Sequence, residues 1–197
     1  SWNRMAVKSI KNKNINNNKR IIKYEKWLSE NKINEMKKAA VLVCFFKKNE
    51  EYYLPLIKRP MHEKNHPGQI ALPGGALEAN ETLENTALRE AFEEVGIIPD
   101  NVEIIGKMTP LPVPVSKYVI TPFIGRTEYE PKWNINEHEV DELIILKFND
   151  LMNSNNGYYE DWNLDGNVLR VPIFKIKDNK IWGATAAVLS ELIDLSV

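Results

Sequence analysis

Short apolar runs divide this chain into a series of predicted strands. The first run, at residues 39–47, is mostly apolar, and the turn Lys48-Asn49-Glu50 leads from it into a second run. Short apolar runs bounded by turn residues are typical of strands in a buried sheet. On this pattern, strands are predicted at residues 39–47, 52–58, 70–72, 102–108, 118–125, 140–148 and 168–176.

Apolar residues at helical spacing predict a helix at residues 82–95. At about 100° per residue, its apolar side chains fall on one arc, which is expected to pack inward. These side chains are Ala87, Leu88, Ala91, Phe92 and Val95. A second helix is predicted to begin near Trp182. It is expected to bury Val188, Leu189, Leu192 and Ile193.

The segments between these elements are predicted to be loops, apart from a short helix at residues 149–152. Residues 128–136 are polar, and residues 153–166 have the Asn, Gly and Asp content of turns. Prolines at positions 110, 112 and 114 impose an extended loop. Because strands and helices do not alternate regularly, the pattern favours an α/β class with a mixed sheet sandwiched between helices.

The first 38 residues differ in character from the rest of the chain. Residues 1–20 are rich in Lys and Asn, and residues 21–38 are predicted to form an extra N-terminal helix. That helix packs either on the domain or on a partner chain. We therefore divide the chain into a basic arm and helix at 1–38 and one globular domain at 39–197. A homodimer is compatible with this division, but the sequence does not determine the oligomeric state.

The composition argues against several classes of partner. The chain has a formal net charge of −1, so it has no overall attraction for nucleic acid or an anionic membrane. No apolar run approaches the length of a transmembrane helix, and the N-terminus lacks the apolar core of a signal peptide. The lone Cys44 is expected to be a reduced core residue, which suits a cytoplasmic protein.

Three carboxylates share one stripe of the helix predicted at 82–95: Glu90, Glu93 and Glu94. Like charges at these spacings repel each other, and Arg89 is the only cation close to them in the sequence. Clustered oxygen donors on a rigid element suit hard divalent cations such as Mg²⁺ or Mn²⁺, which would relieve the repulsion. The alternative interpretation is a solvated acidic helix face.

The spacing of these residues resembles the Nudix box. The resemblance covers residues 75–97, GALEANETLENTALREAFEEVGI, and its specified positions are Gly75, Glu81, Arg89, Glu90, Glu93, Glu94 and Gly96. A pattern with this many specified positions is far more specific than a lone glycine motif. It implies the Nudix fold and the hydrolysis of a nucleoside diphosphate that is linked to another group. The box identifies the reaction but not the substrate.

The resemblance also implies a set of metal ligands. Glu90, Glu93 and Glu94 would bind one or more Mg²⁺ or Mn²⁺ ions, with the Gly74 carbonyl as a further ligand. A distal carboxylate assists some members of the family. Among the acidic residues near the strand predicted at 140–148, we prefer Glu139 for this role.

Three box residues are expected to act in catalysis. Glu93 is the preferred acceptor of a proton from the attacking water. Arg89 lies one helical turn before Glu93 and would orient it, while Glu81 would in turn position Arg89.

A second stretch, residues 56–75, resembles the coenzyme A diphosphatase branch of the family. It reads LIKRPMHEKNHPGQIALPGG, and the implied substrate-binding residues are Arg59, His66, Gly68 and Gln69. Residues 111–125 and 181–192 resemble further parts of the same branch. The implied reaction cleaves the diphosphate of coenzyme A or its thioesters to 3′,5′-ADP and 4′-phosphopantetheine.

Other functions stay open on the sequence. The same chemistry could act on ADP-ribose, a dinucleotide or a modified nucleoside triphosphate. A non-catalytic nucleotide-binding regulator is a more remote alternative, because such a module has no need of all three box carboxylates. Binding of RNA would require a coherent basic patch with aromatic residues, and only residues 8–26 have basic density of that kind.

Overall fold

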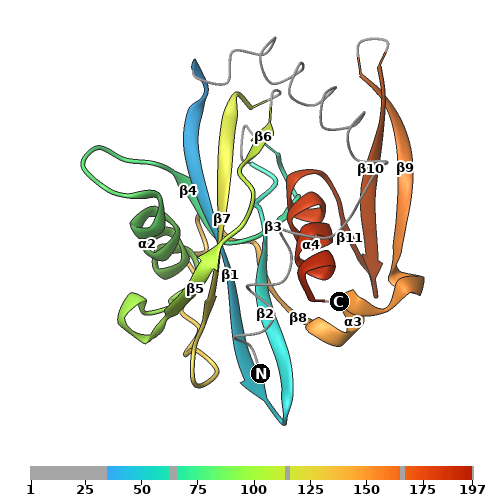
Figure 1. The fold of residues 1–197 in the computed structure, drawn as a ribbon. Helices are drawn as coiled ribbons and strands as arrows, with labels where there is room; N and C mark the ends of the chain where they lie inside the picture. Colours follow the sequence, from blue (N-terminus) through green and yellow to red (C-terminus); the bar gives the residue numbers. More distant parts are fainter. Residues whose placement is uncertain (1–34, 63–65, 114–115, 165–166, 197) are drawn as a thin grey trace.

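The computed structural model describes residues 35–62, 66–113, 116–164 and 167–196. In this part of the chain an eight-stranded mixed sheet forms the middle layer (Figure 1). Its strands are β1 (Lys37–Lys48), β2 (Glu51–Lys58), β3 (Ile70–Ala71), β4 (Gly74–Ala76), β5 (Glu103–Lys107), β6 (Leu111–Val113), β7 (Tyr118–Arg126) and β8 (Glu142–Lys147).

Strand β1 is the centre of this sheet, because it lies between β2 and β7 in the strand order β3-β2-β1-β7-β5. It runs parallel to β7 and antiparallel to β2 and β4. The outer strands are all antiparallel to their neighbours: β3 and β8 pair with β2, while β5 and β6 pair with β7. The sheet is therefore mixed, as the sequence predicted.

Helices cover both faces of the sheet. Helix α2 (Leu83–Val95) lies on one face and helix α4 (Gly183–Ser196) lies on the other (Figure 1). In β1, Leu42 and Cys44 belong to the core on the α2 side, whereas Val43 and Phe45 belong to the core on the α4 side. Burial on both faces explains why this strand is a continuous apolar run. Burial also raises the pKa of the Cys44 thiol to about 12, so the thiol stays protonated.

The prediction of a loop at residues 153–166 is wrong, because a second sheet begins there. Strand β9 (Gly157–Leu164) pairs with β10 (Asn167–Ile176), which pairs with β11 (Asn179–Ile181), all antiparallel. This small sheet lies on the same side as α4 (Figure 1). Tyr158 and Tyr159 of β9 are exposed. The polar composition of β9 therefore reflects an outer strand, and its pairing with β10 overrides the local turn preference.

Three short helical segments join the larger elements: η3 (Pro99–Asn101), α3 (Phe148–Met152) and η4 (Ser154–Asn156). The short helix predicted at 149–152 is confirmed as α3. The proline-rich segment is extended as predicted, but part of it pairs with β7 as strand β6. None of the described helices has the length and apolar character needed to cross a membrane.

The predicted helix at residues 21–38 lies almost wholly outside the described residues. Its last two residues are wrongly assigned, because Lys37 and Lys38 begin β1. They pair with Tyr118 and Val119 of β7, so the sheet, and not a helix, satisfies their backbone groups. The proposed division of the chain at residue 38 stays a prediction.

Candidate active site

Helix α2 is fixed at both ends by local signals. The Thr82 hydroxyl accepts a hydrogen bond from the backbone N–H of Asn85, which caps the first turn. At the other end Gly96 adopts a left-handed conformation with φ of 81°, and its N–H bonds to Ala91 and Phe92 carbonyls. These two caps fix the start and end of the helix that carries the box carboxylates.

The face of α2 that is buried against the sheet differs from the predicted face, because it includes part of the carboxylate stripe. Ala87, Ala91 and Val95 are buried as predicted, but Phe92 is 49% exposed, which corrects its expected inward position. Glu94 is buried instead, with only 3% of its surface exposed. The helix packs on β1 and β4 through the arc that contains Glu94, and Phe92 lies beyond the edge of that contact. The carboxylates therefore line the junction between helix and sheet.

Three carboxylates converge at this junction. Glu90, Glu94 and Glu139 each bring one oxygen to within 4.8 Å of the others. The first two come from α2, and the third comes from the loop that precedes β8. This loop is held on the helix, since the backbone N–H of Asn136 donates to the Glu94 carbonyl at 3.0 Å. Glu93 lies outside this group of three.

The buried carboxyl of Glu94 is bonded to the sheet. The backbone N–H of Gly74 in β4 donates to Glu94 Oε2 at 2.9 Å. Burial nevertheless raises the pKa of Glu94 to about 8, and burial also raises the pKa of Glu90. Oxygen donors gathered in a partly desolvated site are the chemistry that Mg²⁺ or Mn²⁺ requires, so this set fits a divalent cation. A role for the Gly74 carbonyl as a ligand stays a prediction.

Arg89 connects Glu81, which precedes α2, with acidic residues of the helix. Its Nε and Nη2 donate to the two carboxylate oxygens of Glu81 at 3.2 and 3.0 Å, and its Nη1 donates to Glu93 Oε2 at 2.9 Å. Nη1 also lies 2.9 Å from Glu90 Oε1. The bonds from Arg89 lower the pKa of Glu81 to about 2, so this carboxylate stays charged. The geometry allows Glu81 to hold Arg89, and Arg89 to hold Glu93.

Arg59, which directly follows β2, is bonded to residues 68 and 69 just before β3. The Arg59 N–H donates to the Gln69 carbonyl at 2.9 Å, and the Gly68 N–H donates to the Arg59 carbonyl at 3.1 Å. His66 and Gly68 both have positive φ, at 59° and 66°, and the His66 carbonyl accepts from the Gln69 N–H. The positive charge of Arg59 acts on Glu94, where it opposes the rise in pKa. Arg59 therefore lies near the carboxylates.

One positioning residue was missed by the sequence analysis. Asn136 bonds through its N–H to α2, and its carbonyl accepts from the N–H groups of Glu139 and Val140 at 3.0 and 2.9 Å. Its side-chain oxygen accepts from the His138 N–H. The available signal was an Asn at the start of a short polar turn, where its side chain can bond the backbone two residues on. Nothing in the local sequence links that turn to α2.

Comparison with known proteins agrees with this geometry. The family model described as "NUDIX domain" matches residues 36–164, which is more than half of the chain. The chain belongs to the Nudix family. One curated relative, the "Uncharacterized Nudix hydrolase NudL" of Enterobacter sp. (strain 638), is 34% identical over 157 residues, which cover 79% of this chain and 81% of the relative. The protein of the same name from Pectobacterium atrosepticum is 33% identical, over 81% of this chain and 83% of the relative.

Solved structures show the Nudix fold alone. The MutT/nudix family protein from Enterococcus faecalis has a TM-score of 0.53 at 18% identity. The match covers 89% of this chain and 67% of the Enterococcus faecalis chain. The Nudix hydrolase RenU from M. smegmatis has a TM-score of 0.52 at 22% identity over 58% of this chain and 73% of its own. The family model and the curated relatives show that the chain is a Nudix hydrolase, an enzyme that acts on pyrophosphate bonds.

We expect Gly75→Ala to weaken divalent-cation binding by about tenfold or more, as is usual when a residue that orients a metal ligand is changed. A Cβ at position 75 would collide with the Glu90 carboxyl group and push it away from Glu94 and Glu139. Isothermal titration with Mn²⁺ measures the change. Gly106→Ala is the matched control, since its Cβ would meet no atom within 4 Å. Equal Mn²⁺ affinity in the two variants would contradict this placement of Glu90.

The raised pKa of Glu94 predicts a pH-dependent stability in chelator. The carboxyl pKa rises from 4.5 to about 8 on folding, so between these values the folded protein binds a proton that the unfolded chain releases. The free energy of unfolding should therefore fall as the pH rises through this window, and level off above it. Urea unfolding at a series of pH values tests this. Glu94→Gln should show a clearly smaller slope, and an identical slope in both proteins would refute the assignment.

Proposed function

We propose that this Nudix hydrolase cleaves the diphosphate of coenzyme A or its thioesters to 3′,5′-ADP and 4′-phosphopantetheine. The observation that carries the proposal is the bonding of Arg59 to Gly68 and Gln69, which brings these residues together where the charge of Arg59 acts on Glu94 of α2. These residues belong to the stretch that resembles the coenzyme A diphosphatase branch. Their position supports a role in holding the part of the substrate next to the diphosphate.

Glu90, Glu94 and Glu139 are the residues best arranged to hold Mg²⁺ or Mn²⁺, because their oxygens already converge. The Gly74 carbonyl and Glu93 complete the ligand set that the resemblance implies. When bound, such a cation neutralises charge on the diphosphate and lowers the pKa of a water molecule. The protein's own contribution is to gather like charges that would otherwise separate, and α2 and β4 do this by fixing Glu94 in the interface.

Glu93 is our candidate for the general base. Its side chain is 48% exposed, so a water molecule can reach it, and Arg89 holds one of its oxygens. The remaining oxygen is left to accept a proton from the attacking water. Glu81 accepts two further bonds from Arg89, so the guanidinium keeps its position when Glu93 takes up a proton.

Arg59 is our candidate for contact with a substrate phosphate, since a guanidinium suits forked phosphate contacts. Gln69 bonds through its backbone to both Arg59 and His66, and Gly68 adopts the positive φ that this turn requires. We propose small-molecule nucleotides as the partners, not nucleic acid or membranes. A cytoplasmic location agrees with the buried, protonated Cys44.

Glu93→Gln should lower kcat by about 10²-fold or more, because it removes the basic oxygen while keeping the shape of the side chain. Steady-state kinetics at saturating metal measure the effect, and circular dichroism verifies the fold. Glu84→Gln is the matched control, since Glu84 is an exposed carboxylate in the first turn of the same helix. A folded Glu93→Gln protein with kcat equal to that of the control would remove Glu93 from the mechanism.

The substrate is tested by a side-by-side assay with coenzyme A, ADP-ribose and a diadenosine polyphosphate. The last is included because one structural neighbour, from C. elegans, is described as an Ap4A hydrolase. We expect kcat/KM for coenzyme A to exceed that for ADP-ribose by at least about tenfold, or about 1.4 kcal/mol of transition-state binding. Excess chelator should abolish turnover, and Mg²⁺ or Mn²⁺ should restore it.

The comparisons in this assay test the substrate, the metal and the role of Arg59 separately. Better turnover of ADP-ribose or the diadenosine compound would overturn the coenzyme A assignment and leave the Nudix reaction intact. Turnover that persists in excess chelator would overturn the metal assignment. Arg59→Ala should cost more with coenzyme A than with ADP-ribose if Arg59 contacts the 3′-phosphate, and should cost the same with both if it holds the diphosphate.

A further inference from the structure

Strand β8 leaves one edge of the large sheet open. Among the described residues it pairs with β2 alone, from Tyr53 opposite Lys147 to Lys58 opposite Glu142. Its six residues, ELIILK, contain no Pro or Gly. An unblocked apolar edge strand offers a row of free backbone donors and acceptors to another strand, so natural proteins either protect such edges or use them.

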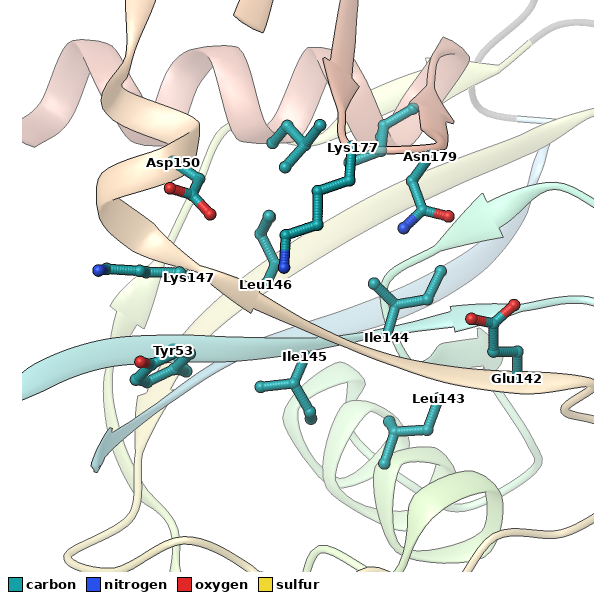
Figure 2. A pocket seen from close by; sticks show the side chains of 12 residues that line it. Tyr53, Glu142, Leu143, Ile144, Ile145, Leu146, Lys147, Asp150, Lys177 and Asn179 are labelled. Atoms are coloured by element: carbon teal, nitrogen blue, oxygen red, sulfur yellow. The ribbon is translucent and has the colours of Figure 1, made fainter. Parts of the chain in front are cut away.

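A groove runs along this open edge. Its volume is about 340 Å³, and it lies between β8 and the turn that joins β10 to β11. Figure 2 shows Lys177 and Asn179 extending from that turn toward β8. Lys177 holds a left-handed conformation with φ of 55°, which is uncommon for a residue of this size. No acidic side chain within the described ranges forms an ion pair with Lys177.

We propose that a second copy of this chain adds its own β8 antiparallel to this edge, with Ile144 of one copy opposite Ile144 of the other. Residues that face each other across two antiparallel strands must lie on the same face of the sheet. The two-fold axis of a symmetric pair must therefore pass through a residue position and not between two positions. The choice of that residue fixes every other contact across the interface.

Within residues 141–147, only the register centred on Ile144 pairs opposite charges. It places Asp141 opposite Lys147 of the second copy, with Leu143 opposite Ile145 of the second copy between them. A register centred on Ile145 leaves Lys147 opposite a leucine, and one centred on Leu143 puts Asp141 opposite an isoleucine. The register centred on Leu143 would also set Lys147 opposite Glu139, but the Glu139 carboxylate lies with those of Glu90 and Glu94. Charge complementarity at both ends of an apolar run is the pattern that fixes strand register.

The groove fits the same register. Glu142 of the second copy falls opposite Leu146, on the face where Ile144 and Lys177 lie in Figure 2. That position brings a carboxylate to Lys177, while side chains of the second strand fill the groove. The β10–β11 turns of the two copies do not collide. Each turn lies beside Leu146 of its own copy, and the two Leu146 residues are four residues apart along the joined strands, or about 13 Å.

The charged ends remain available to a second copy. Lys147 of β8 lies 2.7 Å from Glu51 of β2, and Asp141, which directly precedes β8, lies 3.7 Å from Lys58 of β2. Yet 33% of the Lys147 side chain and 52% of the Asp141 side chain remain exposed. Each of these two side chains can therefore also form an ion pair with the oppositely charged residue of the second copy.

The first test measures the oligomeric state by analytical ultracentrifugation over a range of concentrations. Wild-type protein should dimerise. Asp141→Lys and Lys147→Glu should each raise the dimer dissociation constant by about tenfold or more, because each places like charges opposite one another. The double variant should regain most of the lost affinity, and Lys175→Glu, on an exposed part of β10, is the control that should change nothing. A monomeric wild type, or a dimer whose affinity neither single variant changes, overturns the proposal.

The second test fixes the register by cross-linking. Ile144→Cys places two thiols opposite each other across the two-fold axis, at a Cα separation that a disulfide can span. Mild oxidation should give a covalent dimer, whereas Ile145→Cys should give little, and native Cys44 is too deeply buried to react. Cross-linking of Ile145→Cys in place of Ile144→Cys overturns the register. A folded Ile144→Cys protein that forms no covalent dimer overturns the interface.

Discussion

The contact between the buried carboxyl of Glu94 and the backbone N–H of Gly74 is the interaction on which this site depends. It ties α2 to β4 at the centre of the sheet, and it places a carboxylate where water has little access. A single hydrogen bond offsets only part of the cost of desolvating a charge, which is why the pKa of Glu94 rises to about 8. A divalent cation between Glu90, Glu94 and Glu139 would supply the compensation that the protein lacks.

Close approach of backbone to carboxylates explains the glycines of the central turn. Gly74 has a φ of 155°, and a Cβ there would collide with the Ala40 carbonyl of β1. Gly75 lies against the carboxyl group of Glu90. Any larger side chain at either position would separate β4 from β1 or from α2, and the carboxylates would lose their common position. The same two residues thus serve the packing of the helix and the geometry of the site.

Two kinds of support hold the acidic residues. Those of α2 are fixed by the helix and by Arg89, which bonds to Glu81 and Glu93 at once. Glu139 instead depends on a loop that Asn136 fastens to the helix end, and this loop continues directly into β8. The open edge proposed to receive a second copy therefore begins at Asp141, two residues after a proposed metal ligand. Pairing at that edge would also order the chain that carries Glu139.

Helix α2, six of the eight strands of the large sheet and the box spacing could be predicted from the sequence, because each rests on periodicity or on residues close together in the chain. Strands β4 and β6 could not, because their short Gly- and Pro-containing segments become strands only by pairing with β1 and β7. Tertiary structure decided the rest. The burial of Glu94 in place of Phe92 depends on which arc of α2 meets β1 and β4. The strand at β9 forms because β10 pairs with it, despite a local composition typical of a loop. Glu139 joins Glu90 and Glu94 across more than forty residues, through backbone bonds that no local pattern encodes.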